Sequence, residues 1–275
     1  MGVKRTLNMT HKLLKASPET TFYMLGEIVH NEYVIRDLKD RGLIFISDIR
    51  EIEKPGTVII QSHGAPKKVF SELKKKGIPY IDATCPMVKV IHRRIIELEK
   101  EGYIPLIIGR QGHDEVRGIQ GQVSKSLVVG SEEEVTAALV KNVKKIGVVV
   151  QSTFILEEAQ KIVSCLEEKV REVKFINTIC QPTSLRQQEI QEQSQIHDVV
   201  LIIGSKTSAN TRHLTSLARN GKSRVYLVDR PERIADLDIP QDGSVFIASG
   251  ASTPQYLIEE VIVCLKKKET EHKNG

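Results

Sequence analysis

Residues 199–208 read Val-Val-Leu-Ile-Ile-Gly-Ser-Lys-Thr-Ser. Five apolar, mostly β-branched residues predict a buried strand, and the glycine with the polar residues after it predicts a turn. The next segment, 211–220, is predicted to be a helix because its apolar residues recur at three- and four-residue spacing. A strand, a turn and a helix in this order are typical of an α/β fold with parallel sheets.

The same alternation runs along the whole chain. Four further apolar runs are predicted to be strands, namely 57–60, 105–108, 146–150 and 244–247. Four further helices are predicted at 67–76, 87–100, 157–170 and 256–267. The strands ending at Ile60, Ile108 and Ile203 all lead into a glycine-containing polar turn. We therefore predict three similar α/β units, residues 1–84, 85–178 and 179–275.

Composition narrows the class of protein. Part of the net charge of +5 comes from lysine runs at 74–76 and 266–268, which are typical of solvated faces. Aromatic residues make up only 4%, which argues against a protein that stacks nucleic-acid bases. No apolar stretch approaches the roughly 20 residues that span a bilayer, and no signal peptide is visible. We expect a cytoplasmic protein with no membrane or nucleic-acid partner.

Reactive side chains gather where the predicted strands end. Six follow strands directly: His63, His113, Thr153, Ser208, Asn210 and Ser252. Three more, His30, Cys85 and Cys180, lie at similar turns. Ligands of open parallel sheets bind outside the carboxyl ends of the strands, so these positions predict one site shared by the three units.

The four cysteines fall into two pairs. Cys85 and Cys180 stand at turns before predicted helices, where a thiol is biased toward the metal-binding thiolate. Cys165 and Cys264 lie on apolar helix faces and are interpreted as small packing residues. Disulfides are not expected in the cytoplasm. The candidate ligands show no Cys-x-x-Cys or His-x-x-x-His pair, which disfavours a structural zinc site but leaves zinc open.

Two further features indicate acid chemistry and anion binding. Glu115 lies two residues after His113 and shares a side with it if this turn is extended. In a dry pocket its pKa would rise, and it would serve as a general acid. The polar residues at 208–210 and Ser252 precede helices, so they are either helix caps or phosphate ligands. No nucleotide-binding glycine motif is present.

These segments together resemble the 4-hydroxy-3-methylbut-2-enyl diphosphate reductases of the LytB type, over essentially the whole chain. The resemblance rests on eight ordered motifs: Glu27-Ile-Val-His-Asn31, Ser62-His-Gly64, Asp82-Ala-Thr-Cys-Pro86, Gly112-His-Asp-Glu-Val116, Gln151-Ser-Thr153, Thr178-Ile-Cys180, Ser205-Lys-Thr-Ser-Ala-Asn210 and Gly250-Ala-Ser252. Eight matches in the same order are highly specific.

The resemblance implies a trefoil of three α/β units around a central 4Fe-4S cluster. Cys85 and Cys180 match two of the family's three cluster ligands. The diphosphate would be held by His30, His63, His113, Ser208, Ala209, Asn210 and Ser252. Glu115 would deliver the proton that lets an allylic hydroxyl leave as water, and Thr153 would orient that end. Ferredoxin or flavodoxin is the expected electron donor, because no flavin or NAD motif is present. The products would be isopentenyl and dimethylallyl diphosphate.

The chain departs from the family pattern at two places. Ala209 replaces the usual serine, which removes a hydrogen bond worth on the order of 1 kcal/mol. Met1 stands directly after the position of the family's first cluster cysteine, so that cysteine and an opening strand are absent from the sequence. We expect the first sheet to lack a strand, and the reading frame upstream of Met1 to encode the missing cysteine.

Two other functions remain open. A non-catalytic diphosphate-binding paralogue would keep the pocket but hold no stable cluster. A zinc-dependent phosphate-ester hydrolase would contain zinc and act without a reductant.

Overall fold

The computed structural model describes residues 2–29, 31–250 and 253–274, with the side chains of residues 33, 209 and 271–274 left out. The chain divides into two compact units. One consists of Gly2–Ile28 with Lys39–Ser184, and the other contains Val29–Leu38 with Leu185–Gly275. All strand pairs in both units are parallel, so the predicted α/β class is confirmed.

The larger unit contains two sheets of four strands each. The first has the order β2-β1-β3-β4, with β2 Ile44–Ile46, β1 Phe22–Leu25, β3 Thr57–Ile60 and β4 Tyr80–Asp82. The second has the order β6-β5-β7-β8, with β6 Leu127–Val129, β5 Ile104–Ile108, β7 Lys145–Val150 and β8 Glu172–Ile176. The first sheet thus has as many described strands as the second.

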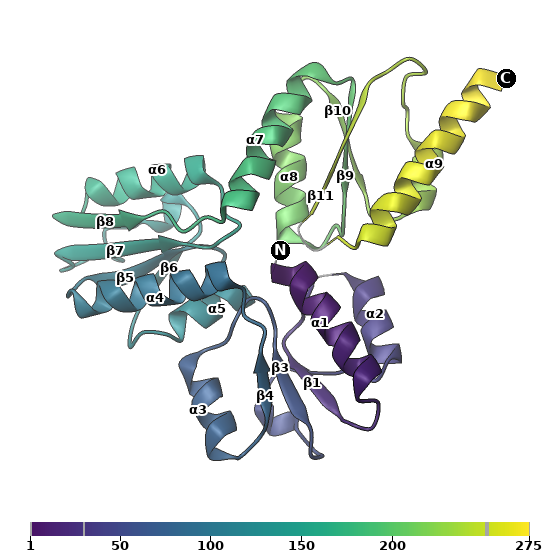
Figure 1. The fold of residues 1–275 in the computed structure, drawn as a ribbon. Helices are drawn as coiled ribbons and strands as arrows, with labels where there is room; N and C mark the ends of the chain where they lie inside the picture. Colours follow the sequence, from purple (N-terminus) through teal and green to yellow (C-terminus); the bar gives the residue numbers. More distant parts are fainter. Residues whose placement is uncertain (1, 30, 251–252, 275) are drawn as a thin grey trace. The chain divides into compact units, whose positions relative to one another are not determined.

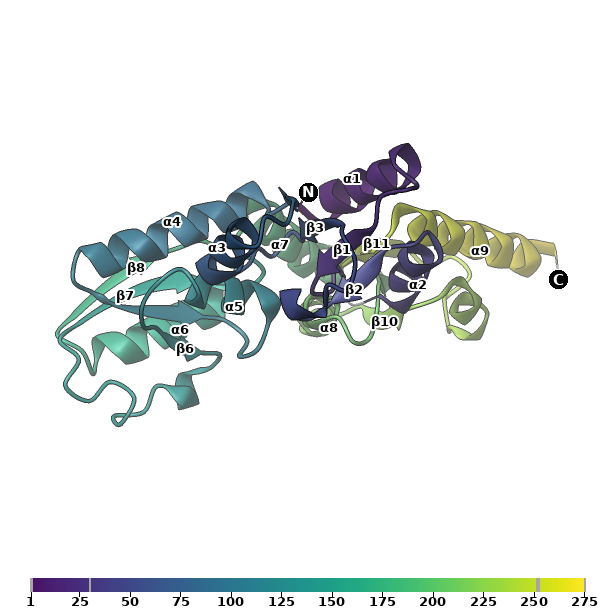
Figure 2. The same cartoon turned by 90° about the horizontal axis from the view of Figure 1, so that it is seen from below.

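The second sheet buries both of its faces, as a parallel sheet requires. Its strands alternate, so that Val148 and Val150 face one side while Ile107 and Val149 face the other. Helix α6 (Leu156–Glu167) packs on the first of these faces. Helices α4 (Pro86–Lys100) and α5 (Asp114–Gln120) pack on the second face (Figures 1 and 2). Helix α5 is short, and it carries Glu115.

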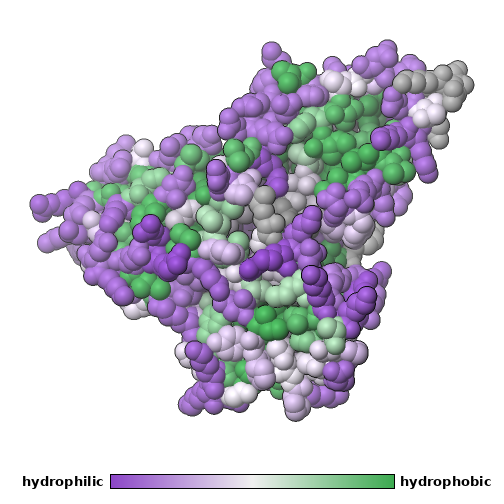
Figure 3. All heavy atoms as spheres, in the orientation of Figure 1, coloured by the Kyte–Doolittle hydropathy of each residue, from purple (hydrophilic) through white to green (hydrophobic). Residues whose placement is uncertain are grey.

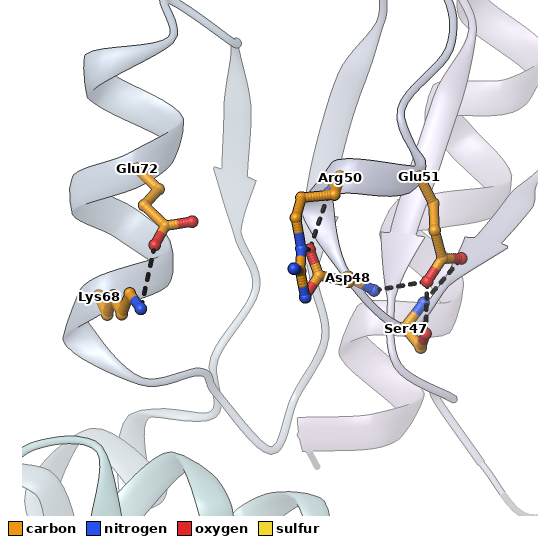
Figure 4. Close-up of polar contacts among 6 residues, drawn as sticks. All are labelled: Ser47, Asp48, Arg50, Glu51, Lys68 and Glu72. Atoms are coloured by element: carbon orange, nitrogen blue, oxygen red, sulfur yellow. Dashed lines mark hydrogen bonds and ion pairs between the residues drawn. The ribbon is translucent and has the colours of Figure 1, made fainter.

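The first sheet is flanked by α1 (Gly2–Ala16) and α3 (Lys67–Lys75) in the same unit. A short 3-10 helix, Ile49–Glu51, follows β2 and is held by a capping box. The Asp48 carboxylate accepts from the Arg50 guanidinium at 2.7 Å, and Glu51 accepts from Ser47 (Figure 4). The pKa of Asp48 is lowered by this arginine. These groups are solvent-exposed, so they fix the loop without forming a reactive site.

The smaller unit has a three-stranded sheet in the order β10-β9-β11. Its strands are β10 Arg224–Val228, β9 Val199–Ile203 and β11 Val245–Ser249. Its helices are α2 (Glu32–Asp40), α7 (Gln181–Ile196), α8 (Ala209–Arg219) and α9 (Gln255–Asn274), of which α2 and α7 extend past the boundary of the unit. Every residue of β9 is buried, whereas every residue of β11 is only half-buried.

The half-buried strand β11 lies beside an open apolar surface. A cavity of about 340 Å³ lies beside β11 and α9, with Ile247 and Leu265 in its wall. Hydrophobic atoms are visible on this part of the surface in the space-filling view (Figure 3). None of the candidate site residues that the structure describes lines the cavity. No helix among the described residues is both long enough and apolar enough to cross a membrane.

Candidate active site

The turn after β3 positions Cys85. It consists of Gln61, Ser62, His63 and Gly64, and Gly64 has the left-handed backbone (φ 80°) that glycine tolerates best. The Ser62 carbonyl accepts a hydrogen bond from the Cys85 N–H at 2.9 Å. Cys85 is the N-cap residue of α4, and Pro86 occupies the first helical position as predicted. The thiol is thereby held on a short, fixed backbone at the end of the first sheet.

Helix α1 closes over the same cysteine. The Arg5 guanidinium donates to the carbonyl oxygens of Ala83 and Thr84, both at 3.0 Å. A Cβ atom at Gly2 would lie only 2.9 Å from the Cys85 sulfur. The sequence analysis did not predict α1, and it attached no role to Arg5 or Gly2. The absence of a side chain at Gly2 allows the start of α1 to approach the thiol.

The turn after β7 repeats this arrangement for Cys180. The Ser152 carbonyl accepts from the Cys180 N–H, again at 2.9 Å, and α7 begins at the next residue. Burial raises the pKa of the Cys180 thiol, and the negative charges of Cys85 and Glu115 raise it further. The predicted bias toward thiolate is therefore not met for Cys180 in the metal-free protein. The same interactions place Cys85 and Glu115 each within electrostatic reach of Cys180.

Glu115 is deeply buried, with 2% of its surface exposed. Its carboxylate accepts hydrogen bonds from the Ser152 N–H at 2.6 Å and from the Ser152 hydroxyl at 2.8 Å. Burial raises the pKa of Glu115, and this outweighs the two hydrogen bonds, which lower it. Glu115 lies in the first turn of α5, so the prediction of an extended turn at this point is wrong. The prediction of a raised pKa is confirmed.

Two histidines lie next to this acid. His113 is the N-cap residue of α5, and its Nδ1 accepts the Glu115 N–H at 3.1 Å. The neutral imidazole therefore carries its proton on Nε2. The His63 ring packs edge-on against it, with the ring centroids 5.3 Å apart. Gly118 of α5 makes this approach possible, because a Cβ there would lie 3.1 Å from the His63 carbonyl oxygen.

The hydroxyl that contacts Glu115 belongs to Ser152, to which the sequence analysis gave no role. The Thr153 hydroxyl instead accepts from the Gln151 side-chain amide at 3.3 Å. A signal for Ser152 was present, because the pair Gln-Ser occurs after both β3 and β7, at 61–62 and 151–152. The repeated pair is important because the serine of each pair accepts the N–H of a cysteine through its carbonyl oxygen.

The smaller unit carries the remaining described candidates at the start of α8. Ser208 is buried and caps the helix, accepting from the Thr211 N–H at 3.3 Å. The side-chain nitrogen of Asn210 is buried without a hydrogen-bond partner among the described residues. A buried donor at a helix N-terminus suits an anion. His30, Ser252 and the side chain of Ala209 lie outside the described part of the chain.

The other two cysteines are packing residues, as predicted. Cys165 packs on the core under α6, and Cys264 packs on the core of the smaller unit. All four cysteines are free thiols. Within residues 2–29, 31–250 and 253–274, no group of three or more His, Cys, Asp or Glu side chains is arranged to hold a metal ion.

Comparison with known proteins places the chain in a family. The family model described as LytB protein matches residues 1–266. The chain belongs to the LytB family. A 4-hydroxy-3-methylbut-2-enyl diphosphate reductase from Caldanaerobacter subterraneus is 35% identical, covering 99% of this chain and 95% of the relative. The reductase from Aquifex aeolicus is 38% identical over 94% of this chain and 90% of its own length.

Solved structures of LytB-family reductases agree with this assignment. A structure of (E)-4-hydroxy-3-methyl-but-2-enyl diphosphate reductase, described as the terminal enzyme of the non-mevalonate pathway, matches with a TM-score of 0.73 and 36% identity. It covers 97% of this chain and 95% of that chain. The reductase structure from Plasmodium falciparum matches with a TM-score of 0.83 and 26% identity, covering 96% and 84% of the two chains.

Proposed function

We propose that this chain is a 4-hydroxy-3-methylbut-2-enyl diphosphate reductase. It removes the allylic hydroxyl reductively and yields isopentenyl and dimethylallyl diphosphate. The observation that carries the proposal is the buried acid Glu115, which lies within electrostatic reach of the free Cys180 thiol and donates its N–H to His113. This reaction needs a proton donor, thiol ligands for a cluster and cationic groups for the diphosphate, and Cys85 and Cys180 would be two of the three cluster ligands that the resemblance implies.

We propose a 4Fe-4S cluster as the resident cofactor. The fit is favourable for the two thiols, because Cys85 and Cys180 are free, half-buried and each fixed by a serine carbonyl. Iron–sulfur clusters are held by cysteine thiolates, which metal binding stabilises despite the raised pKa of Cys180. When bound, the cluster would supply a Lewis-acidic iron and electrons one at a time. The electrons would come from ferredoxin or flavodoxin.

Glu115 provides the first proton. Its raised pKa keeps the carboxyl protonated at a higher pH than an exposed glutamate, so it can give a proton to the departing hydroxyl, which leaves as water. Ser152 holds the carboxylate that remains, through its N–H and hydroxyl. The overall change consumes two electrons and two protons, breaks one C–O bond and forms one C–H bond.

The histidines and the start of α8 are the proposed diphosphate ligands. His113 carries its proton on Nε2 in the neutral form, and protonation of either His63 or His113 would add positive charge for the anion. In the smaller unit, Ser208 and Asn210 would donate to phosphate oxygens from a helix N-terminus. We keep His30, Ala209 and Ser252 in the same role, together with Thr153 as a residue near the hydroxyl end.

The test is anaerobic reconstitution with iron and sulfide, followed by an assay with substrate and a chemical reductant. We expect both five-carbon diphosphates to form, and only when the reductant is present. Release of inorganic phosphate from the substrate by a zinc-loaded sample without reductant would support a phosphate-ester hydrolase instead. Tight substrate binding with no turnover by any metal-loaded sample would support the non-catalytic paralogue.

A further inference from the structure

Helix α4 carries a histidine outside the candidate site. The ring of His92 is half-buried, and its Nε2 is buried without a hydrogen-bond partner among the described residues. Burial lowers the pKa of His92 to about 4, although the charge of Asp82 raises it. The imidazole is therefore neutral at neutral pH and acts through its shape, not through a charge. Buried polar atoms without a partner are unfavourable and rare, so the position of this ring needs an explanation.

The ring of His92 lies against the turn after β3. A Cβ atom on Gly64 would lie 2.8 Å from His92 Cε1 and 3.4 Å from its Nε2, so the ring fills the space that a side chain at 64 would occupy. Gly64 has a left-handed backbone (φ 80°), and its N–H donates to the Gln61 carbonyl at 3.1 Å. The turn can keep this conformation in contact with His92 because residue 64 has no side chain.

Helix α5 holds the same turn from its other side. A Cβ atom on Gly118 would lie 3.1 Å from the His63 carbonyl oxygen, so the backbone of α5 touches the turn directly. The Gln122 side-chain amide donates to the Ala65 carbonyl at 3.0 Å, just after the turn. The turn therefore lies between the backbone of α5 and the ring of His92. Because protein interiors are close-packed, removal of the ring would leave space into which the turn could shift.

We propose that His92 is a positioning residue for the diphosphate site: its ring holds the turn at Gly64 and so keeps His63 edge-on to His113. The ring centroids of His63 and His113 are 5.3 Å apart, and both imidazoles can meet one anion only while this arrangement is kept. The inference rests on the proposed function, since that function assigns the diphosphate to these two histidines. His92 acts through His63 and does not itself bind the substrate.

The test is a double-mutant cycle on the full-length, metal-free chain, with the affinity for inorganic pyrophosphate measured by calorimetry. His92→Ala should weaken binding about tenfold, and His63→Ala should weaken it as well. In the His63→Ala background, His92→Ala should have no further effect, because its action passes through His63. The control is Ile96→Ala, which changes a partly buried residue of α4 that packs on the core of the second sheet. It should lower the melting temperature but leave the affinity unchanged.

Two results would overturn the inference and leave the reductase proposal intact. One is equal affinity of the wild type and of folded His92→Ala. The other is a loss of affinity that is the same with and without His63, as a general destabilisation would give. His92→Asn, a smaller change, should give an intermediate loss, and it replaces His92→Ala in the cycle if the latter does not fold. Failure of the wild type to bind pyrophosphate would overturn the assignment of the diphosphate to these histidines and this inference together.

Discussion

The turns after β3 and β7 fix a cysteine with the same backbone hydrogen bond, but their side chains have different neighbours. Each follows a buried strand with Gln-Ser, and each uses the serine carbonyl to fix a cysteine at the start of a helix. After β3 the next residue is His63, whose ring meets His113. After β7 the serine hydroxyl meets Glu115. The shared backbone fixes a cysteine in each turn, and the differing side chains bring Glu115 to the serine after β7.

The comparison shows which contacts depend on the backbone of the two turns and which depend on a side chain. The cysteine positions depend on main-chain hydrogen bonds accepted by the carbonyl oxygens of residues 62 and 152, which do not require a serine side chain. The acid depends on the identity of one side chain, because only a hydroxyl at 152 can supply the second bond to Glu115. The predictions below use this contrast, beginning with the largest expected effect.

Removal of either fixed thiol should abolish activity. Cys85→Ala and Cys180→Ala each remove a proposed cluster ligand, so reductase activity should fall to background. The matched control is Cys165→Ala, which changes a packing residue on α6 whose sulfur also accepts a hydrogen bond from exposed Lys169, and it should keep most activity. Equal activity of all three variants in the anaerobic assay would show that catalysis does not need the cysteines of these two turns.

Replacement of the buried acid should be the next largest effect. Glu115→Gln keeps the size of the side chain and can still bond to Ser152, but it cannot give up a proton as a carboxyl group does. We expect the turnover rate to fall by about 10²- to 10⁴-fold, with the cluster content unchanged. Asp114→Asn alters the preceding residue and should have a small effect. A Glu115→Gln enzyme with wild-type turnover would show that another group donates the proton.

Substitutions of the two residues after Gln151 should differ in their effect on turnover. Ser152→Ala deletes one of the two hydrogen bonds to the Glu115 carboxylate, which should cost about tenfold in turnover. It should also raise the pKa of Glu115 further, so the pH profile should move to higher pH. Thr153→Val removes the hydroxyl that contacts Gln151 and should change turnover less. The reverse order would support Thr153 as the orienting residue that we proposed from the sequence.

The buried Glu115 should also make the stability of the folded protein depend on pH. Because the pKa of Glu115 is raised in the folded protein, the folded state binds this proton more tightly than the unfolded state does. Its unfavourable contribution is therefore absent below the unfolded pKa and grows as pH rises toward the folded pKa. We expect metal-free Glu115→Gln to melt higher than wild type at neutral pH, with the difference vanishing near pH 4. A difference that is constant with pH would contradict this.

The central strands were predictable because they are uniformly apolar. The five predicted strands correspond to β3, β5, β7, β9 and β11, and most of their residues are β-branched. Strands such as β8, Glu172–Ile176, and β10, Arg224–Val228, were missed because they lie at sheet edges and mix charged with apolar residues. Helix α7 was missed because glutamine and other polar residues give it no apolar stripe.

The candidate site was predictable to the level of segments but not of every side chain. Strand ends located Cys85, Cys180, His63 and His113 because the carboxyl ends of parallel strands meet at one edge. The helical setting of Glu115 was missed since α5 is only seven residues long. The role of Ser152 depends on how two adjacent residues of a tight turn point, which the sequence does not determine.

The most direct test of this account is the metal content of the wild-type chain after anaerobic reconstitution. The central claim is that two thiols from matching turns bind one shared inorganic group. We predict about four irons and four sulfides per chain, with a broad visible absorption that is lost when Cys85 or Cys180 is replaced. Stoichiometric zinc, or iron binding that survives replacement of both cysteines, would contradict the claim.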